Sequence, residues 1–224
     1  MKERASIVVE EYLQVIYSLL SEGKPIKAVN LANRLETSPS TVHATLSRMQ
    51  RDALINIGKK KEIELTEEGF KKAENLAARH RLVETFLCDT LGIPWHEVHT
   101  HAHVMEHGLT PLIEEKLAEF LNFPETCPHG TPIPGSNKTL PENMIQLDAV
   151  KNGDQIEIVV IDESLEDSVE LMRFLEEKKI LPGKQHQVLE TLAVTKTIIL
   201  ESEAGQVTIP FDIANKIGVI PVEE

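Results

Sequence analysis

The spacing of the apolar residues changes once along the chain, and this change limits the possible folds more than any other feature. Up to Phe123 these residues repeat at helical spacing, apart from a short stretch of alternation at 55–65. A proline-rich connector, PETCPHGTPIPG, follows, and beyond it short runs of alternating apolar residues predict strands. We therefore expect a mainly α-helical chain that ends in a small all-β domain.

Residues 1–65 show the pattern of a winged helix-turn-helix domain. Three apolar stripes at helical spacing come first, and Ser38 followed by Pro39 supplies the N-cap and first turn of the third helix. Alternating residues then flank a lysine-rich turn at 58–62, which predicts a β-hairpin, the wing. In such a domain the third helix enters the major groove of double-stranded DNA and the wing lies along its backbone. The candidate DNA contacts are Ser38, Ser40, Thr41, His43, Ala44, Arg48, Arg51, Lys59, Lys60 and Lys61.

The distribution of charge supports a DNA contact at this end of the chain only. The net charge of −13 argues against a protein that coats nucleic acid without selectivity. Between Lys24 and Lys61, however, eight basic residues accompany two acidic ones, whereas from Pro141 onward seven basic residues accompany seventeen acidic ones. The N-terminal end is therefore the part that suits a phosphate backbone.

A histidine-rich stretch, HTHAHVMEH at 99–107, suggests a metal site. On a helix that turns about 100° per residue, His99, His103, Glu106 and His107 share one face and His101 points the other way. Imidazole and carboxylate groups one turn apart are suited to binding divalent transition metals. His80 and Glu84 repeat this spacing on the preceding helix. Because imidazole must be neutral to bind metal, we expect binding to weaken as the pH falls through about 6.5.

Residues 66–136 are predicted to form a helical dimerisation and metal-binding domain. Thr66 caps a long helix whose apolar face, up to Leu91, is too extensive for the winged helix to cover, which suggests a partner subunit. A further helix begins at Pro111, and its apolar residues are expected to point inward; these are Ile113, Leu117 and Phe120. Cys127 and His129 could be metal ligands, but the surrounding prolines and glycine favour a structural turn.

The remaining residues are predicted to form a linker at 137–147 and a small barrel at 148–224. The barrel strands are expected near 156–160, 188–191, 196–201 and 206–209, with a helix around 167–179. The two cysteines form no CxxC pair and no window reaches the length of a membrane span, so we expect a cytoplasmic protein without a membrane segment.

Six segments together point to one family. They are EEYLQVIYSL, SPSTVHATLSRMQRDALI, LTEEG, ARHRLVETFL, HAHVMEH and CPHGTPIPG. The chain resembles the diphtheria toxin repressor and manganese transport regulator family of metal-dependent repressors, in the full-length form with a C-terminal SH3-like (FeoA-like) domain. The resemblance covers the whole chain. It implies a homodimer that binds a double-stranded DNA operator and controls iron or manganese homeostasis.

The resemblance also implies two metal sites. The primary site maps to Glu11, His103, Glu106 and His107, and the ancillary site to His80, Glu84 and His99. The barrel of the family adds a Glu and a Gln to the ancillary site; Ser168 and Leu171 stand there, so Glu166 or Glu170 would have to substitute. The family suggests Fe(II) or Mn(II) as the cofactor. Because these ligands include no sulfur, Zn, Co or Ni are further candidates in vitro.

Two other functional classes remain open from the sequence. The first is a metal-independent winged-helix regulator, in which the histidine cluster would have no function. A metallohydrolase would use the cluster, but the chain contains neither an HExxH motif nor a nucleophile elbow. The repressor interpretation explains both ends of the chain and is the one we expect.

Overall fold

The computed structural model describes residues 2–21, 23 and 25–222 and divides into two compact units, Met1–Arg79 and His80–Glu224. The boundary falls within a continuous helix, α4 (Glu67–Thr85). Each unit is described by itself below. Within the described ranges, no helix combines the length and the apolar composition needed to cross a membrane.

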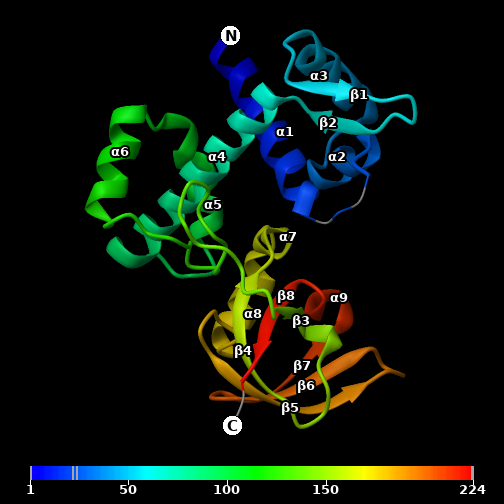
Figure 1. Cartoon of the computed structure of the whole chain (residues 1–224), viewed down its shortest axis with the longest axis vertical. Coiled ribbons are helices and arrows are strands. Elements are labelled where there is room, and N and C mark those ends of the chain that lie inside the picture. The colour runs from blue at the N-terminus through cyan, green and yellow to red at the C-terminus, as the bar shows by residue number, and fades with distance from the viewer. Residues whose placement is uncertain (1, 22, 24, 223–224) are drawn as a thin grey trace. The chain divides into compact units, whose positions relative to one another are not determined.

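The first unit is a winged helix built on three helices. Its elements are α1 (Lys2–Ser21), α2 (Ala28–Arg34), α3 (Pro39–Arg51), β1 (Ile55–Ile57), β2 (Ile63–Leu65) and the first part of α4. Figure 1 shows the three helices and the wing hairpin grouped together. Apolar side chains of all three helices form one core, with Ile16, Leu31 and Met49 fully buried. Ser38 caps α3 as predicted, because its Oγ accepts a hydrogen bond from the Thr41 backbone N–H at 3.2 Å.

The wing is a two-stranded antiparallel hairpin, as predicted. Ile55 pairs with Leu65 and Ile57 with Ile63, which leaves Lys59, Lys60 and Lys61 in the exposed turn. Lys61 takes a left-handed backbone conformation with φ of 60°.

Ala53 and Leu54, which lead into the wing, contact the start of α4. The Thr66 hydroxyl accepts a hydrogen bond from the Gly69 N–H at 3.0 Å and donates one to the Ala53 carbonyl at 2.7 Å. The predicted cap is therefore confirmed. Gly69 lies so close to the wing that a Cβ atom there would be 1.9 Å from the Leu54 carbonyl oxygen. Only glycine permits this approach without a backbone shift.

The helical part of the second unit differs from the prediction at its helix ends. Its elements are the end of α4, a π-helical turn η1 (Phe86–Thr90), α5 (Val98–Met105), a 3-10 turn η2 (Glu106–Gly108) and α6 (Pro111–Phe120). The long helix predicted up to Leu91 thus widens after Thr85. The histidine-rich helix tightens at Glu106, so Glu106 and His107 do not continue the regular α-helical face.

The prediction that Ile113 and Phe120 point inward was wrong. Their exposed fractions are 53% and 67%, and no residue of α6 is buried. Leu117, the third residue predicted to point inward, is half-buried and packs against the helical core of this unit, whereas Leu112, Ile113 and Phe120 leave an apolar stripe exposed in the single chain.

The C-terminal part of the second unit is a six-stranded antiparallel sheet with an SH3-like fold. The strands are β3 (Ile145–Gln146), β4 (Gln155–Ile161), β5 (Gln185–Leu192), β6 (Thr197–Ser202), β7 (Gly205–Pro210) and β8 (Ile217–Pro221), in the order β3-β8-β4-β5-β6-β7. The other elements are a 3-10 turn η3 (Leu147–Ala149) and the helices α7 (Glu163–Glu166), α8 (Val169–Glu177) and α9 (Phe211–Ala214). The four predicted strands are present, whereas β3 and β8 were not predicted. The two residues of β3 fall within the predicted linker and pair with β8.

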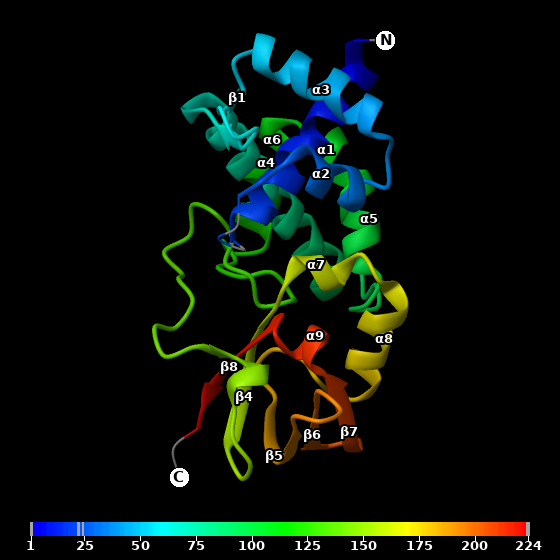
Figure 2. The ribbon, with the colours of Figure 1, turned by 90° about the vertical axis from the view of Figure 1, so that its right-hand side faces the viewer.

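The sheet and the helical part of the second unit are joined by packing and by an ion pair. Trp95, from the segment before α5, packs with the core of the sheet. The guanidinium of Arg81 on α4 lies 2.6 Å from the Glu163 carboxylate on α7. Figure 2 shows α7 where the two parts of this unit meet.

Candidate metal centre

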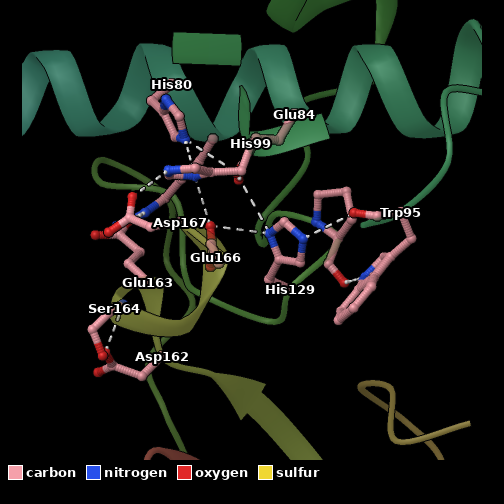
Figure 3. A network of polar contacts seen from close by, with 12 residues as sticks. His80, Glu84, Trp95, His99, His129, Asp162, Glu163, Ser164, Glu166 and Asp167 are labelled. Atoms are coloured by element: carbon pink, nitrogen blue, oxygen red, sulfur yellow. Dashed lines mark hydrogen bonds and ion pairs between the residues drawn. The ribbon is translucent and has the colours of Figure 1, made fainter. Parts of the chain in front are cut away.

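The three residues predicted for the ancillary site come together in the second unit. His80 and Glu84 are one turn apart on α4, and His99 faces them from the first turn of α5. Nε2 of His80 is 3.0 Å from Oε1 of Glu84 and 3.0 Å from Nδ1 of His99. Nδ1 of His99 is 3.2 Å from the same Glu84 oxygen (Figure 3). The spacing on the two helices therefore produces one compact group of donors.

Glu166 joins this group from α7. Its Oε2 is 2.9 Å from Nδ1 of His99, and the ligand atoms of His80, Glu84, His99 and Glu166 all lie within 4.8 Å of one another. Asp162 caps α7 by accepting a hydrogen bond from the Ser164 N–H at 2.8 Å, and this short helix directs the Glu166 side chain inward.

The neighbouring candidates from the barrel lie elsewhere. Ser168 caps α8, with its Oγ accepting a hydrogen bond from the Leu171 N–H at 3.3 Å. Glu170 is exposed. Of the two carboxylates that the sequence offered as substitutes, Glu166 is the one at the centre.

Cys127 and His129 form the predicted turn, but their side chains also reach the centre. Nδ1 of His129 is 3.5 Å from Oε1 of Glu84 and 3.3 Å from Oε2 of Glu166. The ligand atoms of Glu84, Cys127 and His129 lie within 4.8 Å of one another, and all three residues are buried. The favoured interpretation of these two residues as a turn alone therefore missed their contact with the centre. The Cys-x-His spacing was the available signal.

The backbone around His129 fixes the direction of its ring. Its Nε2 donates to the Trp95 carbonyl oxygen at 3.2 Å, so in the neutral ring the lone pair of Nδ1 faces the two carboxylates. The Trp95 indole N–H donates to the Pro128 carbonyl oxygen at 2.9 Å. Gly130 lets the loop approach β4, because a Cβ atom there would be 2.1 Å from the Val159 carbonyl oxygen.

Three residues predicted for the primary site form an adjacent group. Oε1 of Glu106 is 3.3 Å from Nδ1 of His103 and 3.4 Å from Nε2 of His107. The other carboxylate oxygen is 2.6 Å from Nδ1 of His80. His80 therefore contacts Glu106 with one ring nitrogen and Glu84 with the other. The fourth predicted ligand, Glu11, is on α1 of the first unit.

The electrostatics of both groups favour ionised side chains. Burial alone would lower the pKa of His80, but Glu84 and Glu106 outweigh it and raise this pKa to about 10. Burial would raise the pKa of Glu106, but His103 and His80 lower it to about 2. In the same way, neighbouring carboxylates raise the pKa of His99 and His129 despite burial.

The donor set fits a divalent cation. Oε1 of Glu166 is buried and has no hydrogen-bond partner within the described residues, whereas the buried Oε2 of Glu166 and Nδ1 of His129 contact other side chains of the same group. Buried polar atoms normally have partners, so their clustering here needs an explanation. Buried carboxylates combined with imidazole nitrogens are what a divalent transition metal binds.

The predicted DNA contacts lie in the first unit, and most are exposed. Ser40, Thr41, His43, Ala44 and Arg51 lie on the outer side of α3, and the three wing lysines are exposed as well. Ser38 is exposed. Its hydroxyl oxygen lies at hydrogen-bond distance, 2.8 Å, from the hydroxyl oxygens of both Ser40 and Thr41. Arg48 differs, because it is half-buried and lines a cavity of about 500 Å³ between α1, α3 and α4.

Comparison with family models gives two matches that together cover more than half of the chain. Residues 6–63 match the iron dependent repressor N-terminal DNA binding domain. Residues 66–135 match the iron dependent repressor metal binding and dimerisation domain.

Full-length relatives include the iron-dependent repressor IdeR of Mycobacterium leprae, which is 33% identical over 220 residues, 94% of this chain and 95% of the relative. The diphtheria toxin repressor of Corynebacterium glutamicum is 30% identical and covers 96% of each chain. Among solved structures, a manganese-dependent transcriptional repressor in complex with manganese superposes with a TM-score of 0.82 at 28% identity, over 96% of this chain and 100% of that one. The structure of ScaR with bound Zn²⁺ superposes with a TM-score of 0.80 at 27% identity, over 96% of this chain and 99% of that one.

Proposed function

The chain belongs to the iron-dependent repressor family, and from that premise we propose how its metal and DNA sites act together. As a member of this family it is a metal-dependent, DNA-binding transcriptional repressor and not an enzyme. The proposals concern the ligands, the metal, the partners and the switch. The observation that carries them is the convergence of four donors from α4, α5 and α7 within 4.8 Å of one another, three of them buried and His99 half-buried.

We assign two metal sites. The primary site uses Glu11, His103, Glu106 and His107, where the inclusion of Glu11 rests on the sequence resemblance. The ancillary site uses His80, Glu84 and His99, and Glu166 supplies the ligand from the SH3-like domain, at 2.9 Å from His99. The proposed domain limits are 1–65 for DNA binding, 66–136 for dimerisation and metal binding, 137–147 for the linker and 148–224 for the SH3-like domain.

We propose Fe(II) or Mn(II) as the physiological metal. One relative is named an iron-dependent repressor and one structural neighbour was solved with manganese. Divalent metal binding as such is general in this family. Because affinity rises along the Irving–Williams series, Zn, Co or Ni should bind at least as tightly in vitro, so supply in the cell decides occupancy.

The proposed switch is thermodynamic linkage. When bound, a divalent cation supplies the positive charge that holds ligands of the two units together. Glu11 belongs to α1 of the DNA-binding unit, whereas His103, Glu106 and His107 belong to the other unit. Fixing one unit to the other would set the distance between the recognition helices of a dimer, which must match half-sites about one DNA turn apart. A metal at about 100 times its dissociation constant shifts this equilibrium by about 2.7 kcal/mol, about a hundredfold.

The proposed partners are a double-stranded DNA operator and a second copy of the chain. Exposed α3 and the lysine wing suit the operator, and the uncovered apolar stripe of α6 suits the second copy. We place the protein in the cytoplasm, where a bacterial repressor meets its DNA.

Substitution of Glu106 by Gln tests the function and the site together. Glu106 contacts three imidazoles, so the loss of its charge should weaken metal binding and lower operator affinity about a hundredfold at a fixed metal concentration. The measurement is a gel shift on a duplex selected from a random pool, first with chelator and then with Mn(II), Fe(II) or Zn(II) added back. His101→Gln is the matched control, because His101 is exposed on α5, the helix that leads into the 3-10 turn with Glu106.

The outcomes separate the hypotheses. If the wild-type chain binds the duplex equally well in chelator, it is a metal-independent regulator. If Glu106→Gln responds to metal like the wild type, the assignment of the primary site is wrong. A normal circular dichroism spectrum of the variant shows that the loss does not come from unfolding.

A further inference from the structure

The cavity of about 500 Å³ in the first unit contains none of the proposed metal ligands. It is bounded by α1, α3 and α4, which lie side by side in both Figure 1 and Figure 2. Its volume falls within the range of sites that hold small molecules, roughly 300–1,000 Å³. Because α3 carries most of the predicted DNA contacts, a ligand in this cavity would touch the helix that reads the operator.

One part of the cavity wall is apolar. Leu13, Leu54 and Leu76 are buried there, and Val9 is half-buried. The same four side chains belong to the core of the winged helix or pack against it, so they are held in place without a ligand. They offer a surface for a hydrocarbon or aromatic group, as the walls of most small-molecule sites do.

The half-buried polar part of the wall has more positive than negative charge. Arg48 from α3 and Arg79 from α4 are half-buried, and one half-buried carboxylate, that of Glu10 on α1, accompanies them. Two guanidinium groups carry about ten N–H donors in total, whereas one carboxylate accepts about four hydrogen bonds. A further anion can therefore be bound here, and charge interactions are stronger at such positions than at exposed ones.

The exposed charges at the rim do not alter this balance. Lys72 and Asp52 have opposite charges, and each has a partner on its own segment. Nζ of Lys72 is 3.2 Å from Glu68, and Oδ1 of Asp52 is 3.5 Å from Nε of Arg51. The remaining polar lining residue, Asn75, is uncharged. Three basic and two acidic residues thus line the cavity, an excess of one positive charge that matches a monoanion.

We propose that this cavity binds a small amphipathic monocarboxylate, which acts as an effector of operator binding. The carboxylate pairs with Arg48 and Arg79, since a guanidinium can bind a carboxylate through two parallel hydrogen bonds, and the apolar part of the ligand packs on the three leucines. Arg48 is on the recognition helix, so the bound ligand places a negative charge beside the helix that approaches the DNA phosphates. Occupancy therefore lowers operator affinity, and operator binding lowers ligand affinity by the same factor.

Calorimetric titration of the full chain tests the chemistry of the ligand. The titration is done in chelator, because a bound metal ion would itself attract a carboxylate. Octanoate is the probe, octanamide has the same chain without the charge, and acetate has the charge without the chain. Octanoate should bind with one molecule per chain and at least about tenfold more tightly than the other two, because only octanoate matches both parts of the wall.

Substitutions on α4 locate the bound carboxylate. Arg79→Gln should weaken octanoate binding about tenfold or more, with a normal circular dichroism spectrum. Lys72→Gln changes an exposed lining residue, with little risk to folding, and should weaken binding about two- to fivefold. Lys71→Gln is the matched control, because Lys71 is exposed on the same helix and does not line the cavity, and it should bind octanoate as the wild type does.

Gel shifts of the metal-loaded chain measure the effect on DNA. Saturating octanoate should lower the operator affinity of the wild type about fivefold or more and leave that of Arg79→Gln unchanged. An operator affinity that octanoate does not change would refute the effector role.

Two calorimetric results would overturn the binding site itself. One is octanamide binding as tightly as octanoate to the unmodified chain, which would show that the charge is not recognised. The other is equal octanoate affinity in Arg79→Gln and Lys71→Gln. These titrations need neither metal nor DNA, so their outcome is independent of the proposed metal sites and switch.

Discussion

His80 places one ring nitrogen against each of the two predicted metal-binding groups. Nδ1 is 2.6 Å from Glu106 and Nε2 is 3.0 Å from Glu84, so both nitrogens are engaged before a metal binds. The sequence predicts the pair His80 and Glu84 from their spacing on one helix. It could not predict the contact with Glu106, because that contact depends on how α5 packs against α4 and on the 3-10 turn that follows α5.

Metal affinity should change with pH above about 6.5, the pKa of an ordinary imidazole, because the pKa of His80 is raised. The carboxylates that outweigh burial raise the pKa of His80 to about 10 from an ordinary value of 6.5, so His80 carries a proton at neutral pH in the metal-free chain. A nitrogen that keeps its proton cannot bind metal. We expect Mn(II) affinity to rise as the pH increases from about 6.5 towards about 10, with release of protons.

Calorimetry in two buffers that differ in ionisation enthalpy measures this proton release. An equal heat in both buffers near pH 7.5 would show that His80 is already neutral and would contradict the prediction. His101→Gln serves as the control, because exposed His101 should not contribute to the proton count.

Helices and strands whose ends are marked by short sequence patterns could be predicted from the sequence. Those whose conformation depends on packing against distant segments could not. The Ser38 cap, the wing hairpin and the Thr66 cap all follow from short-range sequence patterns and are confirmed. The π-helical turn at Phe86–Thr90 and the strand β8 carry no comparable local signal. Their conformation depends on neighbouring segments that are distant in sequence.

Substitution of Gly69 by Ala should destabilise the first unit. The new Cβ would lie 1.9 Å from the Leu54 carbonyl oxygen, so the start of α4 or the wing must move. Overpacking of this kind costs about 1–3 kcal/mol. Urea unfolding with circular dichroism should show a lower midpoint.

Gly58→Ala is the matched control in the same unit, because its Cβ would meet only the Glu62 carbonyl oxygen at 3.8 Å. An unfolding midpoint for Gly69→Ala equal to that of Gly58→Ala would show that the backbone relaxes freely at this position.

At the scale of the whole chain, the centre joins residues that no local pattern connects. His80 and Glu166 are 86 residues apart, and Cys127 and His129 lie between them in a segment whose prolines predict only a turn. The family resemblance predicts that His80, Glu84 and His99 lie together, and the structure shows them as neighbours. It could not choose between Glu166 and Glu170, because that choice depends on the position of the short helix α7.

The open stripe of α6 leads to a prediction about assembly. Leu112 is 65% exposed there, next to Ile113, and a charge at such a position is unfavourable in an apolar contact between two copies. Leu112→Glu should shift the chain from dimer to monomer in analytical ultracentrifugation and weaken operator binding.

Val194→Glu provides the comparison, because Val194 is 98% exposed in the turn between β5 and β6. Both substitutions add a charge to an exposed apolar position and should change the stability of the single chain little. If both variants remain dimeric, the contact between copies lies away from α6.

The order of the donors along the chain has a consequence for biosynthesis. His80, Glu84 and His99 leave the ribosome first, Cys127 and His129 follow, and Glu166 is the last. The strands β5 to β8, which complete the sheet packed with Trp95, come later still. Because domains fold as units once their residues have been made, a nascent chain cannot assemble this group of donors before the strands of the sheet have been made. We therefore expect the ancillary site to bind metal only after the SH3-like domain has folded.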